Sequence, residues 1–173
     1  AGSGHRDILQ WARSEDCPWD DRTCSAAAEG GHLEVLQWAR SHGANTVAAK
    51  AGHLHILEWM ASNYVWDNDN VCEAAAKGGH LNVLKWARHN GFRWNSSTCT
   101  VAAAGGHLGV LQWARTHGCD WGVRTSYEAA GRGHLEVLKW ARCNGCPWDS
   151  RLCSIAARKG HFDVLKWARR NGC

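Results

Sequence analysis

Histidine recurs at one fixed place along this chain, and imidazole is the side chain best suited to bind metals or transfer protons at neutral pH. Seven histidines each follow a glycine directly: His5, His32, His53, His80, His107, His134 and His161. If each belongs to one of a row of stacked helical units, neighbouring rings lie about 10 Å apart, whereas zinc holds its ligands within about 2.1 Å. We therefore expect no metal site, and we predict a structural role for this histidine in the first turn of a helix.

Cysteine also recurs in register. The chain has nine cysteines, and eight of them fill two repeating apolar slots: Cys24, Cys72, Cys99 and Cys153 in one, and Cys17, Cys119, Cys146 and Cys173 in the other. This repetition favours thiols packed in an intracellular, reducing compartment, the cytoplasm, over a disulfide framework. The spacing of Cys143 and Cys146 resembles a redox or zinc half-site, but no matching pair lies near it in the sequence, and we favour ordinary packing.

Other catalytic patterns are missing from the sequence. No serine, cysteine or carboxylate stands apart from the repeating pattern as a lone nucleophile would, and there is no phosphate-binding loop or dinucleotide fingerprint. We therefore predict a protein that is not an enzyme and that has no cofactor and no small-molecule substrate.

The elements that carry these residues form a repeat. Gly-His recurs every 27 residues, except between Gly31 and Gly52, where the interval is 21. Such a period indicates a solenoid, in which each unit buries its apolar face against its neighbours. We interpret the chain as a single array over residues 1–173, with units at about 1–18, 19–44, 45–65, 66–92, 93–119, 120–146 and 147–173. Because neither end carries a polar terminal unit, we expect a fragment of a longer array.

Composition agrees with a folded array. Apolar residues make up 45% and charged residues 21% of the 173, and the 12 tryptophans fall at repeated positions. The net charge of +4 is too mild to indicate a nucleic-acid or membrane surface by itself. No apolar run is long enough to span a membrane, and no signal-peptide pattern begins the chain.

Each unit reads as two short helices. In the last unit, Asp149 can cap a helix over 150–159, Gly160 can end it in the left-handed conformation, and a second helix follows over 161–170. Helices of about ten residues are unstable alone, so neighbours must supply their stability. Paired alanines let the first helices pack closely, and a tryptophan on each second helix is expected to interlock adjacent units: Trp11, Trp38, Trp59, Trp86, Trp113, Trp140 and Trp167.

One complete unit shows a family resemblance. The string T-C-S-A-A-A at 23–28, followed by G-G-H-L-E-V-L-Q-W-A-R-S-H-G at 30–43, resembles the ankyrin repeat, and the resemblance covers nearly the whole chain. Ankyrin units have about 33 residues, so about six are missing, at the place of the protruding hairpin. The chain thus resembles the shortened, tryptophan-rich ankyrin type of protists, algae and large DNA viruses. The implied fold class is all-α, a helix-turn-helix solenoid with truncated or absent β-hairpin fingers.

Two further columns could bind a partner or could simply pack. The loop tryptophans could stack on a ligand, but we favour packing that closes the shortened loop: Trp19, Trp66, Trp94, Trp121 and Trp148. The arginines near the end of the second helix could face an acidic partner or phosphates, but we favour a solvated helix end: Arg13, Arg40, Arg88, Arg115, Arg142 and Arg169.

Residues that differ between units are the candidates for recognition, because stacking requires sameness and recognition requires difference. These residues follow the loop tryptophan or lie on the first helix: Asp20, Asp21, Arg22, Ser25, Asn68, Asp69, Asn70, Glu73, Ser96, Ser97, Thr100, Val123, Arg124, Tyr127, Ser150, Arg151 and Ser154. The ankyrin resemblance implies that they line a concave face, with Tyr127 as an aromatic anchor. Neutral drift at exposed positions is the alternative.

The shortened unit lacks the loop tryptophan, and we expect its first helix to lose about one turn, leaving a notch or a kink. For the whole chain, the resemblance implies a non-enzymatic module that binds a protein partner. The alternatives are a structural subunit or linker embedded permanently in a large assembly and, less favoured, a nucleic-acid-binding protein that uses the arginine column.

Overall fold

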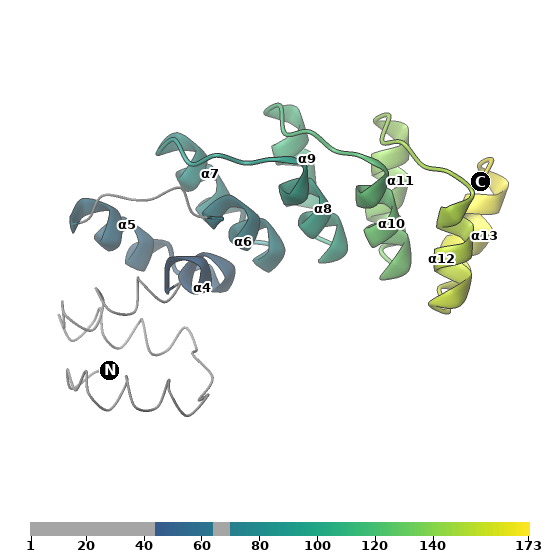
Figure 1. Ribbon diagram of the computed structural model, residues 1–173, viewed down its shortest axis with the longest axis horizontal. Helices are drawn as coiled ribbons and strands as arrows, with labels where there is room; N and C mark the ends of the chain where they lie inside the picture. The colour runs from purple at the N-terminus through teal and green to yellow at the C-terminus, as the bar shows by residue number, and fades with distance from the viewer. Residues whose placement is uncertain (1–43, 64–69) are drawn as a thin grey trace, which may run out of the picture.

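In the computed structural model, which describes residues 44–63 and 70–173, the chain is a row of helix pairs (Figure 1). The first helices of the pairs form one layer: α4 (Ala44–Ala51), α6 (Val71–Gly78), α8 (Ser96–Ala104), α10 (Val123–Gly131) and α12 (Arg151–Arg158). The second helices form the other: α5 (Leu54–Asn63), α7 (Leu81–His89), α9 (Leu108–Thr116), α11 (Leu135–Cys143) and α13 (Phe162–Arg170). The prediction of an all-α solenoid is confirmed.

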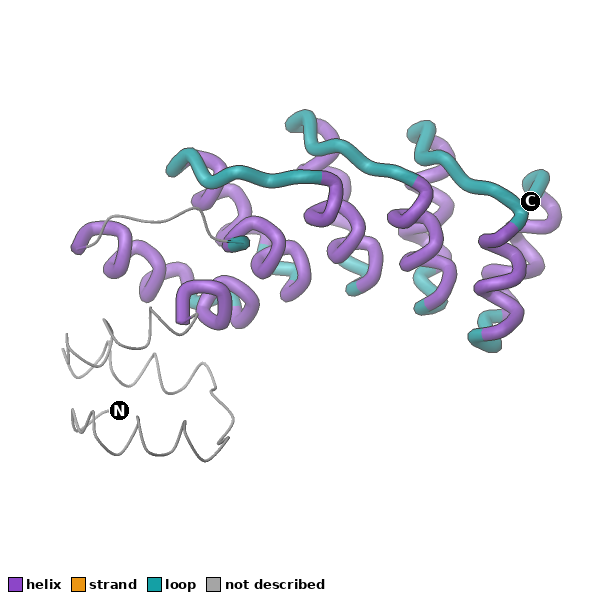
Figure 2. The backbone as a smooth tube through the Cα atoms, in the orientation of Figure 1, coloured by secondary structure: helices purple, strands orange, loops and turns teal. Residues whose placement is uncertain are grey.

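The connections also follow the predicted pattern. The described residues contain no strand, and Figure 2 shows the connections between successive pairs running along one edge of the row. Helix α12 begins and ends within one residue of the predicted span 150–159. The carboxylate of Asp149 accepts a hydrogen bond of 2.9 Å from the backbone N–H of Arg151, so Asp149 does cap this helix as expected.

The core runs through the whole row. Paired alanines of the first helices, such as Ala102 and Ala103, are completely buried, as is a leucine such as Leu111 on each internal second helix. A helix of about nine residues would not persist alone in water. The buried faces between pairs therefore supply the stability that the individual helices lack.

The repeated histidine links each pair to the preceding one. His134 Nε2 donates a hydrogen bond to the backbone carbonyl of Ala104, and His161 Nε2 to that of Gly131, each over 3.0 Å. His107 Nε2 makes the same bond to Lys77 over 3.2 Å. The accepting carbonyls belong to the last turns of α6, α8 and α10, where a helix leaves carbonyls without an internal partner. The expected structural role is therefore a hydrogen bond between units.

The histidine ring also packs against a glycine of the preceding unit. Gly106 has φ +74, and a Cβ atom there would lie 2.7 Å from Nδ1 of His134. Gly118, which ends a second helix, has φ +84 but open space around it. Glycine is required at position 106 for two reasons, the left-handed backbone and the space that the His134 ring occupies. At position 118 only the left-handed backbone favours glycine.

This difference gives a matched pair of variants. Gly118→Ala should cost about 1–2 kcal/mol of unfolding free energy, because a side chain strains the left-handed backbone. Gly106→Ala should cost at least about 1 kcal/mol more, because the methyl group also displaces the His134 ring and its hydrogen bond. Urea unfolding followed by tryptophan fluorescence measures both, and equal losses would contradict this role of His134.

The described cysteines are all free thiols. The two slots face each other within a unit: Cys99 Sγ points to the carbonyl of Cys119 at 3.9 Å, and Cys119 Sγ donates to the carbonyl of Asn95 at 3.2 Å. Cys143 is exposed, whereas Cys146 is completely buried, so these two residues of the C-x-x-C sequence have different surroundings. Burial raises the pKa of Cys146 and raises that of Cys72 to about 11.

These surroundings predict the order of alkylation. Because the thiolate is the reacting species, a pKa of about 11 leaves only about one Cys72 in a thousand reactive at pH 8. Iodoacetamide at pH 8 should therefore modify Cys143 first and reach Cys72 and Cys146 only in urea, and their reaction should accelerate as the pH rises. Mass spectrometry of tryptic peptides gives the order; a native Cys72 that reacts as fast as Cys143 would disprove it.

The prediction for the shortened unit is wrong in one respect. Helix α4 has eight residues, as many as α6 and α12, and its Ala48 and Ala49 are completely buried. In the sequence α4 begins one residue after Gly43, whereas α10 begins five residues after the matching Gly118. The deletion has shortened the connection and kept the first helix, which packs on α6. The expected notch or kink concerns the junction with residues before Ala44, which lie outside the described part of the chain.

Candidate functional site

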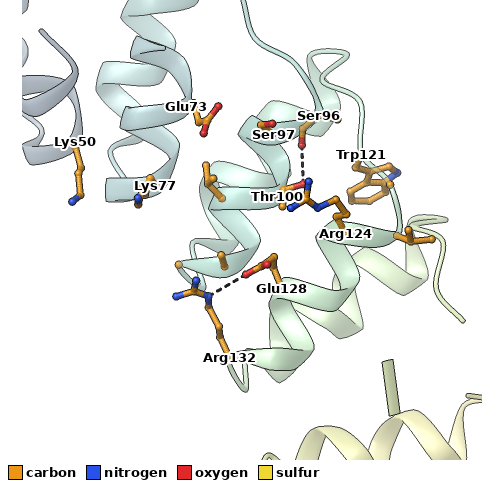
Figure 3. A pocket seen from close by; sticks show the side chains of 15 residues that line it. Lys50, Glu73, Lys77, Ser96, Ser97, Thr100, Trp121, Arg124, Glu128 and Arg132 are labelled. Atoms are coloured by element: carbon orange, nitrogen blue, oxygen red, sulfur yellow. Dashed lines mark hydrogen bonds and ion pairs between the residues drawn. The ribbon is translucent and has the colours of Figure 1, made fainter. Parts of the chain in front are cut away.

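A groove crosses the surface formed by the first helices α4, α6, α8 and α10, which we call the first-helix face (Figure 3). Its volume is about 630 Å³. The lining side chains come from all four of these helices and from the connection before α10: Lys50, Glu73, Lys77, Ser96, Ser97, Thr100, Val101, Ala104, Gly105, Trp121, Gly122, Val123, Arg124, Glu128 and Arg132. The site is therefore a shared surface of several units.

Small residues at the end of α8 help to form this hollow. Ala104 occupies the place in its unit that Lys50 and Lys77 occupy in theirs, and Gly105 occupies the place of Arg132. The long side chains of the neighbouring units therefore stand on either side of a short gap. Figure 3 shows Lys50 and Lys77 on one side and Arg132 on the other.

The charge of the groove is mainly positive. Its lining includes four cationic side chains and two anionic ones. Glu128 and Arg132 form an ion pair of 3.2 Å. Within residues 44–63 and 70–173, Lys50, Lys77 and Arg124 have no ion-pair partner. Their charges remain available to a ligand.

Hydroxyl groups line the middle of the groove at the start of α8. Ser96 and Ser97 are exposed, and the backbone N–H of Ser97 donates to the side chain of Asn95 over 2.8 Å. Thr100 Oγ1 donates to the Ser96 carbonyl over 2.9 Å and lies 3.3 Å from Thr125 Oγ1 on the next helix. Thr100 is thus fixed in place, whereas the two serine side chains face solvent.

The structure brings part of the sequence-predicted set together. Six of those residues line the groove: Glu73, Ser96, Ser97, Thr100, Val123 and Arg124. Four others are exposed at the first helices outside it: Asn70, Ser150, Arg151 and Ser154. The remaining predicted residues, apart from Tyr127, lie outside the described part of the chain: Asp20, Asp21, Arg22, Ser25, Asn68 and Asp69.

Tyr127 is placed differently from an exposed anchor. Its side chain is partly buried and packs against the core. Its hydroxyl oxygen is shielded from solvent and has no well-aligned hydrogen bond within the described residues. The nearby Asp149 carboxylate raises the pKa of Tyr127, and Tyr127 lowers the pKa of Asp149 in return. The phenol therefore faces the next unit, and only part of its ring remains for a partner.

Sequence reasoning missed the groove residues at the ends of the first helices. Lys50, Lys77, Ala104 and Arg132 stand just before the repeated Gly-His, in segments that read as part of the constant stacking pattern. These residues could have been found from their variation between units, because the position that Lys77 occupies in one unit is occupied by Ala104 in the next.

The loop tryptophans and the arginine column form one structure along the connections between units. An arginine of one unit lies over the loop tryptophan of the next, with distances from Cζ to the ring centroid of 4.3 Å for Arg88–Trp94, 4.8 Å for Arg115–Trp121 and 4.5 Å for Arg142–Trp148. Each loop ring packs edge-on against the helix tryptophan of its own unit, at 5.7 Å for Trp94–Trp113, 5.6 Å for Trp121–Trp140 and 5.5 Å for Trp148–Trp167. We call each set an Arg–Trp–Trp clamp.

The clamp changes two expectations. The helix tryptophans stack on a loop tryptophan of their own unit, and the loop tryptophans and arginines add a contact between units that was not expected. The arginines are not a simple solvated helix end, because Arg115 also donates to the carbonyl of Cys119 over 3.0 Å. Packing of the loop tryptophans onto the helices is confirmed.

A double-mutant cycle tests the clamp. Arg142→Ala and Trp148→Ala should show a coupling of about 0.5–1 kcal/mol in unfolding free energy, because a cation over an indole face is attracted by the ring. Arg169→Ala is the control, since its second helix is followed by no tryptophan in this sequence. Additive losses for Arg142 and Trp148 would show that the stacking is energetically irrelevant.

Among the described residues, no three histidine, cysteine or acidic side chains converge where they could hold a metal ion. None of the described helices has the length and apolar character needed to cross a bilayer.

Comparison with known proteins agrees with the observed architecture. Residues 127–169 match the family model described as ankyrin repeats in many copies. The crystal structure of the human ASB11 ankyrin repeat domain is similar, with 21% sequence identity and a TM-score of 0.64 over 75% of this chain and 69% of that chain. No curated protein sequence matches the chain.

Proposed function

We propose that this chain, an ankyrin-repeat protein, is a non-enzymatic module that binds a protein partner through its first-helix face. Ankyrin repeats are generally protein–protein interaction modules, and their fold family is a scaffold without catalytic activity. The observation that carries the proposal is the groove of about 630 Å³, where residues that vary between units gather from four first helices.

The cationic side chains of the array differ in whether they already have an interaction partner within the protein. Along the connections between units the arginines are stacked on tryptophans, and on α11 Lys139 is paired with Glu136 at 2.8 Å. On the first-helix face, Lys50, Lys77 and Arg124 are free of such partners within the described residues. A partner can therefore bind these three cations without breaking an ion pair or an Arg–Trp–Trp clamp.

The same contrast argues against nucleic acid as the ligand. The phosphate-binding candidates named from the sequence were the arginines of the second helices, and Arg88, Arg115 and Arg142 are the ones that form clamps. We also infer a reducing, intracellular compartment, a proposal supported by recurring cysteines that pack as buried thiols.

Partner capture with two charge-matched variants tests the proposed face. Lys77 and Arg124 change to Glu in the groove variant, and Lys85 and Lys166, which are exposed on α7 and α13, change to Glu in the control. Lysate from the native source is passed over each immobilised protein, and bound proteins are quantified by mass spectrometry. A protein captured by wild type should fall about tenfold or more with the groove variant, since charge reversal at a contact is repulsive, and should persist with the control. Equal capture by both variants, or no capture, refutes the proposed face.

A further inference from the structure

We propose that the groove binds an extended, acidic segment of the partner protein, which crosses Ala104 while its carboxylates reach Lys77 and Arg124. This inference rests on the proposed function and specifies the ligand of the same face.

The positions of the free cations require an extended ligand. Lys50, Lys77 and Arg124 belong to α4, α6 and α10, and helices packed side by side lie about 10 Å apart. The cations therefore span about 30 Å across four first helices, a length that about nine residues of extended chain cover. A compact anion could meet only one or two of these charges.

The composition of the groove requires an acidic ligand with an apolar part. With Glu128 and Arg132 paired, the remaining charges are three cations against Glu73. Val101 and Val123 line the same groove, and Val123 is 38% exposed. An apolar side chain between the carboxylates of the segment can pack on this group and gain from its removal from water.

The gap at Ala104 gives the segment a place to approach closely. A long side chain in place of Ala104 would block the path of a peptide main chain between Lys77 and Arg124. Among the described first helices, the residue two places before the repeated Gly-His is shorter than Ala104 only at Gly131. The next residue after Gly131 is Arg132, whose long side chain lies at the edge of the groove. Figure 3 shows Lys77 on one side of the groove and the ion pair of Glu128 and Arg132 on the other.

A nucleic acid fits this groove less well than a peptide. Glu73 and Glu128 would face a continuous row of phosphates, whereas a peptide can place neutral residues there. The only ring in the lining, Trp121, has Arg115 over one face at 4.8 Å and Trp140 against it at 5.6 Å. A base therefore has little free aromatic surface on which to stack.

The test begins with a library of random 12-residue peptides displayed on phage and selected on the full chain. Selected sequences should be enriched in Asp and Glu around an apolar residue. The consensus peptide, labelled with fluorescein, is then titrated by anisotropy at 50 and 200 mM salt, beside a single-stranded oligonucleotide of 12 nucleotides.

Ala104→Lys separates a seated segment from general attraction between charges. Lysine stands at the matching place in the units of Lys50 and Lys77, so the substitution is compatible with the helix, and circular dichroism verifies folding. It adds positive charge but fills the gap. A seated segment should bind about fivefold or more weakly to Ala104→Lys, whereas attraction by charge alone predicts tighter binding. Lys77→Glu with Arg124→Glu should weaken binding about tenfold or more, and Lys85→Glu should leave it unchanged.

The outcomes are distinct. The proposal of an acidic segment is overturned if the selection yields neutral or basic peptides, or no peptide at all. It is also overturned if the groove variants bind the peptide with unchanged affinity, if Ala104→Lys binds it more tightly, or if the oligonucleotide binds more tightly than the peptide. If capture of a native partner still depends on the groove in those cases, the proposed function stands with a different ligand. If capture also fails, both proposals fall.

Discussion

The structure depends on how each short helix pair is joined to the next. A helix of eight or nine residues does not persist alone, so the contacts between units must supply what the local sequence cannot. The repeated histidine does this with one side chain, because its ring fills the space beside a glycine turn and its Nε2–H reaches an unpaired carbonyl of the preceding first helix. The same carbonyls would otherwise need water at a packed interface.

The opposite edge of the array is joined by a different chemistry. There the shortened connections place a tryptophan between the arginine of one unit and the tryptophan of the next second helix. The two edges together fix the spacing and orientation of successive pairs. The histidine recurs in every unit, and the clamp residues recur in every internal unit except the shortened one, which lacks the loop tryptophan and has Ala61 in place of the arginine. These positions leave little freedom for recognition, and the exposed positions of the first helices are where the sequence can vary.

The groove shows how variation in a repeat can create a binding surface without a dedicated domain. Ala104 stands between Lys77 of the preceding unit and Arg132 of the next, and its short side chain leaves a gap bordered by charge on both sides. The ligand inferred for it follows from this arrangement, since an extended acidic chain is the shape and charge that the gap and the free cations share. Tyr127, by contrast, turns its hydroxyl toward Asp149 and contributes to stacking.

The sequence by itself determined the all-α array, the helix pairs and the cap at Asp149, because these follow from periodicity and from local hydrogen bonding. It also singled out six of the side chains that line the groove, because they vary from unit to unit. Only the tertiary structure decided that Lys77 and Ala104 share a groove with Arg124, that Arg115 stacks on Trp121, and that α4 keeps its length. These facts depend on which way a side chain points once neighbouring units have packed. A single-unit pattern cannot contain that information, because the partner atoms lie in another unit.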